Sequence, residues 1–136
     1  MNQVFIDSSA FVALYLQDDD FHKKAVGVLK KLQQEQRELV TSNFILDEVY
    51  TFNRAKRGKM VAVDFTHFLA ENVDVVRVNR ITIQDEQKAL YYFSSLDGKG
   101  VSFTDCTSFA LMKRMGIQEA LTFDSDFKKA GFTILT

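Results

Sequence analysis

Short apolar runs alternate with longer segments of helical periodicity along almost the whole chain, and this alternation restricts the fold more than any other feature. The apolar runs are typical of strands that are covered on both faces. Strand–helix–strand units form right-handed crossovers, so the pattern predicts an α/β fold with a mostly parallel central sheet of about five strands and helices on both faces. The expected strands are residues 4–6, 39–41, 73–78, 120–123 and 132–135, and the expected helices are residues 10–16, 21–36, 43–57, 60–71, 83–95 and 104–116.

Residues that begin and end helices mark several of these boundaries. Ser8 or Ser9 is the expected cap of the first helix, and Thr104 is the expected cap of the last one. Gly58 and Gly116 stand where the third and sixth helices should end, because glycine tolerates the left-handed backbone conformation that often follows a helix.

Length and composition are those of one ordinary globular domain, which we expect to span residues 1–136. The net charge of −1 argues against nucleic-acid binding through overall charge, so such a site would have to be a local patch. A single cysteine excludes an intrachain disulfide and a four-cysteine zinc site. There is no basic leader, and no apolar run approaches the roughly 18 residues of a membrane span, so we expect a cytoplasmic protein without membrane contact.

Three aspartates stand where a parallel α/β fold collects its ligand-binding groups. Asp7 directly follows the first expected strand, and Asp124 directly follows the fourth. Ligands bind outside the carboxyl ends of parallel strands, so both side chains should reach one edge of the sheet. Asp105 lies in the first turn of a helix, where the helix dipole favours an anion. Each of these acids taken alone is equally well explained as a helix cap.

Glu48 is harder to explain as a structural residue. Its neighbours one turn away on the expected helix include Phe44, Ile45 and Phe52, so its carboxylate interrupts an apolar stripe. A buried, unpaired charge is costly, and a glutamate in this position needs a basic partner or a cation. Asp47 points off the stripe and is expected to be solvated.

Several carboxylates that face one another repel, and a divalent cation removes the repulsion. Oxygen ligands suit Mg²⁺ or Mn²⁺ better than zinc. Such a centre can activate water for attack on a phosphodiester without a nucleophilic side chain. The two histidines, His22 and His67, fall in helical stretches away from the strand ends, and Cys106 would be a lone soft ligand. We therefore assign these three residues to structure rather than to the site.

The four acidic segments resemble the motifs of PIN-domain ribonucleases, in the family's order. The opening motif is Val-Phe-Ile-Asp7-Ser-Ser-Ala-Phe, the second is Ile-Leu-Asp-Glu48-Val-Tyr, and the third is Phe-Thr-Asp105-Cys-Thr-Ser-Phe-Ala-Leu-Met. The closing motif is Ala-Leu-Thr-Phe-Asp124-Ser-Asp-Phe, followed by Ala-Gly-Phe. The third motif is especially similar to that of toxins of the VapC type. The resemblance runs from Val4 to Phe132 and so covers almost the whole chain.

This resemblance implies an endoribonuclease that uses Mg²⁺ or Mn²⁺ and acts on transfer, ribosomal or messenger RNA. It assigns Asp7 and Asp105 as core metal ligands, Glu48 as a ligand or an orienter of water, and Asp124 as the residue that completes the site. Weaker candidates are Asp126, Thr104 and Ser108, the last two being equally well explained as a cap and a first-turn hydroxyl. A toxin of this type is further expected to form a homodimer and to pair with a small antitoxin.

A basic run ends the helix that carries Glu48 and is a candidate RNA contact. Arg54 and Arg57 lie there with two lysines, which equally suits favourable charge at a helix C-terminus. If the run binds RNA, replacing Arg54 and Arg57 with alanine should weaken binding and flatten its salt dependence. Unchanged affinity and an unchanged salt slope would exclude this role.

Other phosphoryl-transfer and nucleotide-binding folds fit the sequence less well. A haloacid-dehalogenase-like phosphatase needs a second aspartate at the position of Ser9, and a response-regulator receiver needs an acid near Asn79. A Rossmann cofactor site needs a glycine-rich first turn, which Ser8, Ser9 and Ala10 do not provide. Two alternatives within the same family stay open: a PIN nuclease of RNA maturation without an antitoxin, and a non-catalytic PIN module that binds RNA or protein.

Overall fold

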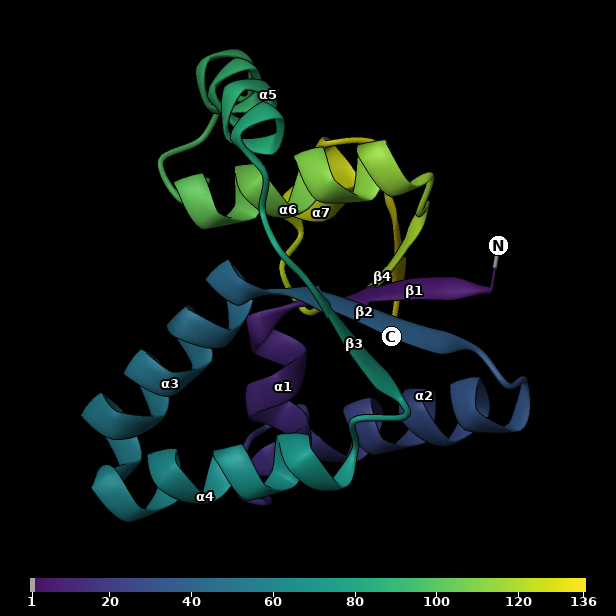
Figure 1. Ribbon diagram of the computed structural model, residues 1–136, viewed down its shortest axis with the longest axis vertical. Coiled ribbons are helices and arrows are strands. Elements are labelled where there is room, and N and C mark those ends of the chain that lie inside the picture. The colour runs from purple at the N-terminus through teal and green to yellow at the C-terminus, as the bar shows by residue number, and fades with distance from the viewer. Residues whose placement is uncertain (1) are drawn as a thin grey trace.

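The computed structural model describes residues 2–136, and Met1, the first residue of the expected domain, lies outside that range. Five parallel strands form one sheet in the order β3-β2-β1-β4-β5, as the alternation of strands and helices predicted (Figure 1). The strands are β1 (Gln3–Ile6), β2 (Glu38–Ser42), β3 (Val76–Asn79), β4 (Glu119–Leu121) and β5 (Thr133–Leu135). The helices are α1 (Ser8–Tyr15), α2 (His22–Gln34), α3 (Asn43–Arg57), α4 (Lys59–Glu71), α5 (Ile83–Ser95), α6 (Phe103–Met115) and α7 (Asp126–Lys129).

Helices cover both faces of the sheet. Figure 1 shows α1, α2, α3 and α4 on one face and α5, α6 and α7 on the other. Phenylalanines fill much of the interior between these layers: Phe5, Phe11, Phe65, Phe109 and Phe127 are almost completely buried. The central strand β1 pairs with both neighbours, Phe5 lying opposite Val40 on one side and Ala120 on the other. This two-sided burial explains why the strand sequences are continuous apolar runs rather than alternating ones.

Two caps differ from the sequence predictions, and both differences concern the site. Asp7, not Ser8 or Ser9, is the N-terminal cap of α1, and it makes no capping bond through its side chain. Ser102, not Thr104, caps α6 and forms a reciprocal capping box with Asp105. Other hydrogen bonds explain both differences. The hydroxyls of Ser8 and Ser9 donate to carboxylates of the site instead of capping the helix, and Ser102 has an acidic capping partner, Asp105, three residues later.

Smaller differences lie at strand ends. The third strand begins at Val76 instead of residue 73, because the chain turns through Asn72, whose carbonyl accepts the N–H groups of Val75 and Val76. The fourth strand ends at Leu121, and the short helix α7 follows without having been predicted. The predicted bounds of α5 agree with the structure. Within residues 2–136, no helix is both long and apolar enough to cross a membrane.

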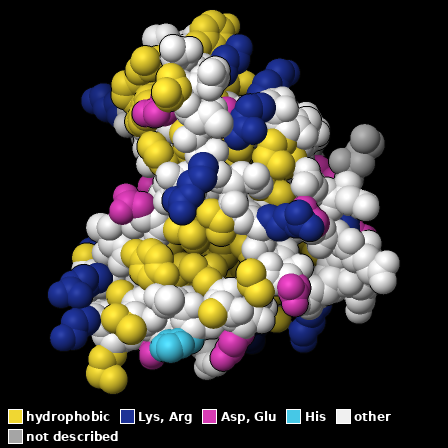
Figure 2. All heavy atoms as spheres, in the orientation of Figure 1, with side chains coloured by type: hydrophobic (Ala, Val, Ile, Leu, Met, Phe, Trp, Pro, Cys, Tyr) yellow, Lys and Arg dark blue, Asp and Glu magenta, His cyan; other side chains and the backbone are white. Residues whose placement is uncertain are grey.

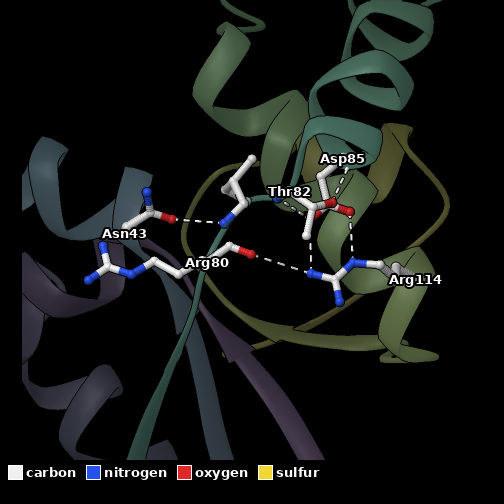
Figure 3. A network of polar contacts seen from close by, with 6 residues as sticks. Asn43, Arg80, Thr82, Asp85 and Arg114 are labelled. Carbon is white, nitrogen blue, oxygen red and sulfur yellow. Dashed lines mark hydrogen bonds and ion pairs between the residues drawn. The ribbon is translucent and has the colours of Figure 1, made fainter.

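An ion pair fixes the first turn of α5 to α6 (Figure 3). Arg114 Nε and Nη2 donate to the two carboxylate oxygens of Asp85 at 2.8 and 2.9 Å. The side chain of Asp85 is 2 % exposed and also accepts the N–H of Thr82, so the guanidinium pairs a buried charge and lowers the pKa of Asp85. On the other side, Asn43 at the start of α3 accepts the N–H of Ile81 at 2.9 Å. These bonds join both helical layers to the carboxyl end of β3.

Candidate active site

The four acids of the sequence motifs line one cavity of about 500 Å³ at the carboxyl edge of the sheet. Each comes from a different segment: Asp7 follows β1, Glu48 lies on α3, Asp105 lies in the first turn of α6, and Asp124 follows β4. The central strands β1 and β4 are neighbours, so their ends bring Asp7 and Asp124 together although the two residues are far apart in sequence. The remaining lining residues are Ser8, Ser9, Val12, Asp19, Phe21, Phe52, Ser102 and Phe123.

Hydroxyl groups hold the carboxylate of Asp7 in place. Thr122 donates to Asp7 Oδ2 at 2.8 Å, and Ser9 donates to the same oxygen at 3.1 Å. The Asp7 side chain is therefore directed at the end of β4 instead of capping its own helix. Burial raises the pKa of Asp7 to about 6, although these hydrogen bonds act in the opposite direction. Both hydroxyls are supporting groups that the sequence patterns did not identify as part of the site.

Ser8 connects Asp7 with Glu48. Its hydroxyl donates to Glu48 Oε1 and lies 3.5 Å from Asp7 Oδ1. The helix that carries Glu48 begins at Ser42, whose hydroxyl accepts the N–H of Ile45 at 3.1 Å. Glu48 is partly exposed and lies between the fully buried Ile45 and Val49 on the same helix. The structure thus places this carboxylate at the cavity, where the interruption of the apolar stripe led us to expect it.

Asp105 is oriented by the start of its helix. Its Oδ2 accepts the N–H of Ser102 at 3.2 Å, and its own N–H donates to the Ser102 hydroxyl at 3.0 Å. The residue is 6 % exposed. Burial, and then the negative charges of Asp7 and Asp124, raise the pKa of Asp105 to about 7. A carboxylate that is buried among other carboxylates is stabilised in its charged form by a cation.

Asp126 belongs to the same group of acids. One carboxylate oxygen from each of Asp105, Asp124 and Asp126 lies within 4.8 Å of the others. The N–H of Asp126 donates to Asp124 Oδ1 at 2.9 Å, and Lys129 Nζ lies 3.2 Å from Asp126 Oδ1. The lysine balances part of the charge of Asp126. Asp126, the weakest acidic candidate from the sequence, therefore lies in the same group as Asp105 and Asp124.

The side chains at the cavity suit a hard divalent cation. All of the candidate ligands are carboxylates, and hydroxyls from Ser8, Ser9 and Thr122 orient two of them. Cys106 follows Asp105 but is fully buried, and burial raises the pKa of its thiol to about 11, so it is neutral near pH 7. His22 donates from Nδ1 to the carbonyl of Ala13 at 2.7 Å, which is a structural contact.

The remaining candidates lie away from the cavity lining. The carbonyl of Thr104 accepts the hydroxyls of Thr107 and Ser108, so Ser108 is engaged within its own helix. Arg57 Nη1 pairs with Asp18 Oδ2 at 2.7 Å, and Arg54 is exposed in the last turn of α3. Ser102 and Thr122, which orient acids of the site, were missed by the sequence analysis. The hydroxyl three residues before Asp105 and the one two residues before Asp124 were the available signals.

The chain is similar in sequence and in fold to known proteins. The family model described as "PIN domain" matches residues 4–133. Among curated proteins, the chain is 36% identical over 130 residues to the 23S rRNA-specific endonuclease VapC20 of Mycobacterium tuberculosis, covering 95% of both chains. A crystal structure of that VapC20, described as a Sarcin-Ricin loop cleaving toxin, superposes with a TM-score of 0.81 and 34% identity over 96% of each chain.

A more distant solved structure shares the fold alone. FitAcB from Neisseria gonorrhoeae superposes with a TM-score of 0.68 at 13% identity, covering 98% of this chain and 96% of that one. The family motifs, the length of the match and the identity to VapC20 give one consistent result: the chain belongs to the PIN-domain family.

Proposed function

We propose that this protein is a metal-dependent endoribonuclease and the toxin of a type II toxin–antitoxin pair. The observation that carries the proposal is the convergence of Asp7, Glu48, Asp105 and Asp124 on one cavity. A relative that matches the chain over nearly its full length is named as a 23S rRNA-specific endonuclease. This activity is favoured over a non-catalytic binding module, because four carboxylates would repel the phosphates of RNA in a cavity that only bound it.

Each acid has a distinct task in the proposed mechanism. Asp7 and Asp105 would hold the cation directly, since both are buried and each is repelled by a neighbouring carboxylate, so both would benefit from it. Asp124 completes the ligand set, with Asp126 as a further ligand whose charge Lys129 moderates. A Mg²⁺ or Mn²⁺ ion bound there would lower the pKa of a water ligand and stabilise charge on the phosphodiester.

Glu48 and the hydroxyls complete the proposed mechanism. Glu48 either binds the cation or orients the attacking water, and the Ser8 hydroxyl fixes Glu48 Oε1 on the side of Asp7. Thr122 and Ser9 hold Asp7 Oδ2, so this oxygen is oriented before RNA binds. Such preorganisation lowers the reorganisation that the reaction requires.

The first test is cleavage of purified ribosomes, mature and immature ribosomal RNA, transfer RNA and a messenger RNA in Mg²⁺, Mn²⁺ or excess chelator. Asp105→Asn retains the size of the side chain and removes the charge that a cation needs. Asp47→Asn is the matched control, because Asp47 is adjacent to Glu48 in sequence but exposed and outside the cavity lining. We expect discrete cleavage by the wild type and by Asp47→Asn, and none with chelator or by Asp105→Asn.

The outcomes separate the functions within the family. Cleavage that persists in Asp105→Asn would refute this site. Binding of RNA without cleavage of any substrate would favour the non-catalytic module. Ribosomal RNA is the first substrate to test because VapC20 is named for it, and cleavage of immature transcripts alone would instead favour an RNA-maturation nuclease.

Protein partners form the last part of the proposal: a second copy of the chain and a small antitoxin, acting with it in the cytoplasm. Figure 2 shows apolar side chains gathered in the hollow between β3, α3 and α4. Exposed apolar residues of these elements include Val78 on the edge strand and Met60 and Val63 on α4. Light scattering of the protein alone, and again after co-expression with a neighbouring short reading frame, would measure both associations.

A further inference from the structure

Three phenylalanines line the same cavity as the four carboxylates, and two of them are substantially exposed. Phe21 is 44 % exposed and Phe52 is 39 % exposed, and both line the cavity together with Phe123. Five other phenylalanines are almost completely buried in the core, so this fold does not lack interior positions for aromatic rings. Exposed aromatic surface beside a polar site is typical of ligand contact.

The ring of Phe123 packs against one face of the Phe21 ring. Phe21 and Phe123 are stacked with ring centroids 4.5 Å apart and an interplanar angle of 12°. One face of Phe21 is thus supported, while a large part of the side chain is left in contact with solvent. A planar heterocycle placed on the open surface would continue the stack, and every nucleobase offers such a plane.

Both exposed rings are positioned by the elements that position the acids. Phe52 lies one helical turn after Glu48 on α3, and Phe123 directly precedes Asp124. The N–H of Phe21 donates to Asp19 Oδ1 at 2.9 Å, which fixes the start of α2. The pair between Asp18 and Arg57 joins this loop to the end of α3. The aromatic rings and the carboxylates therefore share one framework.

Charge favours the same interpretation. The described lining of the cavity contains no lysine or arginine and the protein carries a net charge of −1, so basic side chains there do not supply affinity for the phosphates of RNA. Stacking of bases does not depend on charge. In a duplex the faces of a base are covered by its neighbours, so only an unpaired base could reach Phe21 or Phe52.

We propose that Phe21, backed by Phe123, and Phe52 form a stacking platform for an unpaired nucleobase next to the scissile phosphodiester. This inference rests on the proposed ribonuclease function and deepens it, because it assigns the side chains that would position the RNA beside the cleaved bond. Phe21 and Phe52 are substrate-positioning residues rather than members of the metal site.

The test uses binding, so that it can be separated from cleavage. In the Asp105→Asn background, anisotropy measures the affinity for a short fluorescent single-stranded RNA and for the same sequence in a duplex, in magnesium buffer. We expect the single strand to bind more tightly than the duplex. We expect Phe21→Leu or Phe52→Leu to weaken single-strand binding by about 5- to 150-fold, the range that loss of one base–aromatic stack gives. Phe93→Leu is the matched control, because Phe93 is 51 % exposed and lies outside this cavity.

A second variant reports stacking directly. The chain contains no tryptophan, so Phe21→Trp introduces a single indole whose fluorescence is quenched when a base stacks on it. We expect Phe21→Trp to retain binding and to be quenched by the single-stranded RNA, whereas Phe93→Trp is not quenched. Circular dichroism melting of each variant verifies that the fold is intact.

The inference is overturned if the leucine variants bind as tightly as the Phe93→Leu control, if the duplex binds equally well, or if no RNA quenches Phe21→Trp. If the wild type cleaves RNA and Phe21→Leu and Phe52→Leu cleave and bind it equally well, the proposed function stands and the platform is refuted. Binding that depends on both rings, in a protein that cleaves nothing, would support the platform and refute the nuclease.

Discussion

Replacing Asp105 with asparagine should have two opposite effects: it abolishes metal-dependent cleavage, and it stabilises the metal-free protein. The capping box survives, because an asparagine amide oxygen can accept the Ser102 N–H as Asp105 Oδ2 does at 3.2 Å. What disappears is a buried negative charge near Asp7 and Asp124. The same change therefore removes a cation ligand and a repulsive interaction.

The magnitude follows from the pKa of Asp105. Burial and repulsion raise this pKa from 3.8 to about 7. At about 1.4 kcal/mol per pH unit, holding the group ionised at pH 8 destabilises the folded state by about 4 kcal/mol. Burying the neutral amide of asparagine is also unfavourable. We therefore expect Asp105→Asn to stabilise the metal-free fold by about half of the 4 kcal/mol, on the order of 2 kcal/mol. For a domain of this size, such a gain raises the melting temperature by about 6 °C.

The direction of the pH dependence can be measured at the same time. Because the folded pKa is raised, the folded state of the metal-free protein binds more protons than the unfolded chain between about pH 4 and pH 7. Its free energy of unfolding should fall as the pH rises through that window, and it should fall less in Asp105→Asn. Added Mg²⁺ or Mn²⁺ should restore the stability of the wild type alone, since ligand binding stabilises only the form that binds it.

Differential scanning calorimetry in chelator at pH 5 and pH 8, repeated with each metal, distinguishes these outcomes. Asp47→Asn is the control for a neutralised exposed acid on α3. A lower melting temperature for Asp105→Asn than for the wild type, in chelator at pH 8, would refute a destabilising charge at Asp105. The cation site itself is refuted if neither metal shifts the wild-type transition.

Three further predictions concern other parts of the chain. Metal-dependent cleavage should increase between pH 5.5 and pH 8, because protons compete with the cation at Asp7 and Asp105, whose pKa values are about 6 and about 7; a flat profile of kcat/KM would contradict this. Asn53→Leu should raise the free energy of unfolding by about 1 kcal/mol, because both polar atoms of this buried side chain lack a hydrogen-bond partner among the described residues; a loss in urea denaturation would indicate a hidden partner. Arg114→Ala should destabilise the fold by about 1–3 kcal/mol by leaving Asp85 buried without its cation. The deficit should shrink as the pH falls through the lowered pKa of Asp85, and a deficit that does not depend on pH would contradict the ion-pair explanation.

The sequence alone was sufficient for the fold class, because the evidence for it is local. Apolar runs and helical periodicity reflect backbone preferences over a few residues, and the predicted α5 has the observed bounds. The acids after β1 and β4 were also predictable, since the carboxyl ends of parallel strands meet at one edge. Glu48 was predicted to lie at the site because a charge that interrupts an apolar stripe needs a partner, and the structure places it at the cavity.

The supporting groups were decided only by tertiary structure. Thr122 bonds to Asp7 across 115 residues of sequence, and no local pattern links the two. The capping box of Asp105 is an exception, because its signal is local: Ser102 has an acid three residues later, whereas Thr104 is followed by Thr107 at that position. Asp126 joins Asp105 and Asp124 because an unpredicted turn of helix follows Asp124. The stack of Phe21 on Phe123 requires the start of α2 to meet the end of β4, which depends on the strand order and the loop geometry together.

Local sequence therefore specified which residues could do the chemistry, whereas contacts between distant segments decided how those residues are held, because side-chain orientation depends on packing partners that lie far away in the chain.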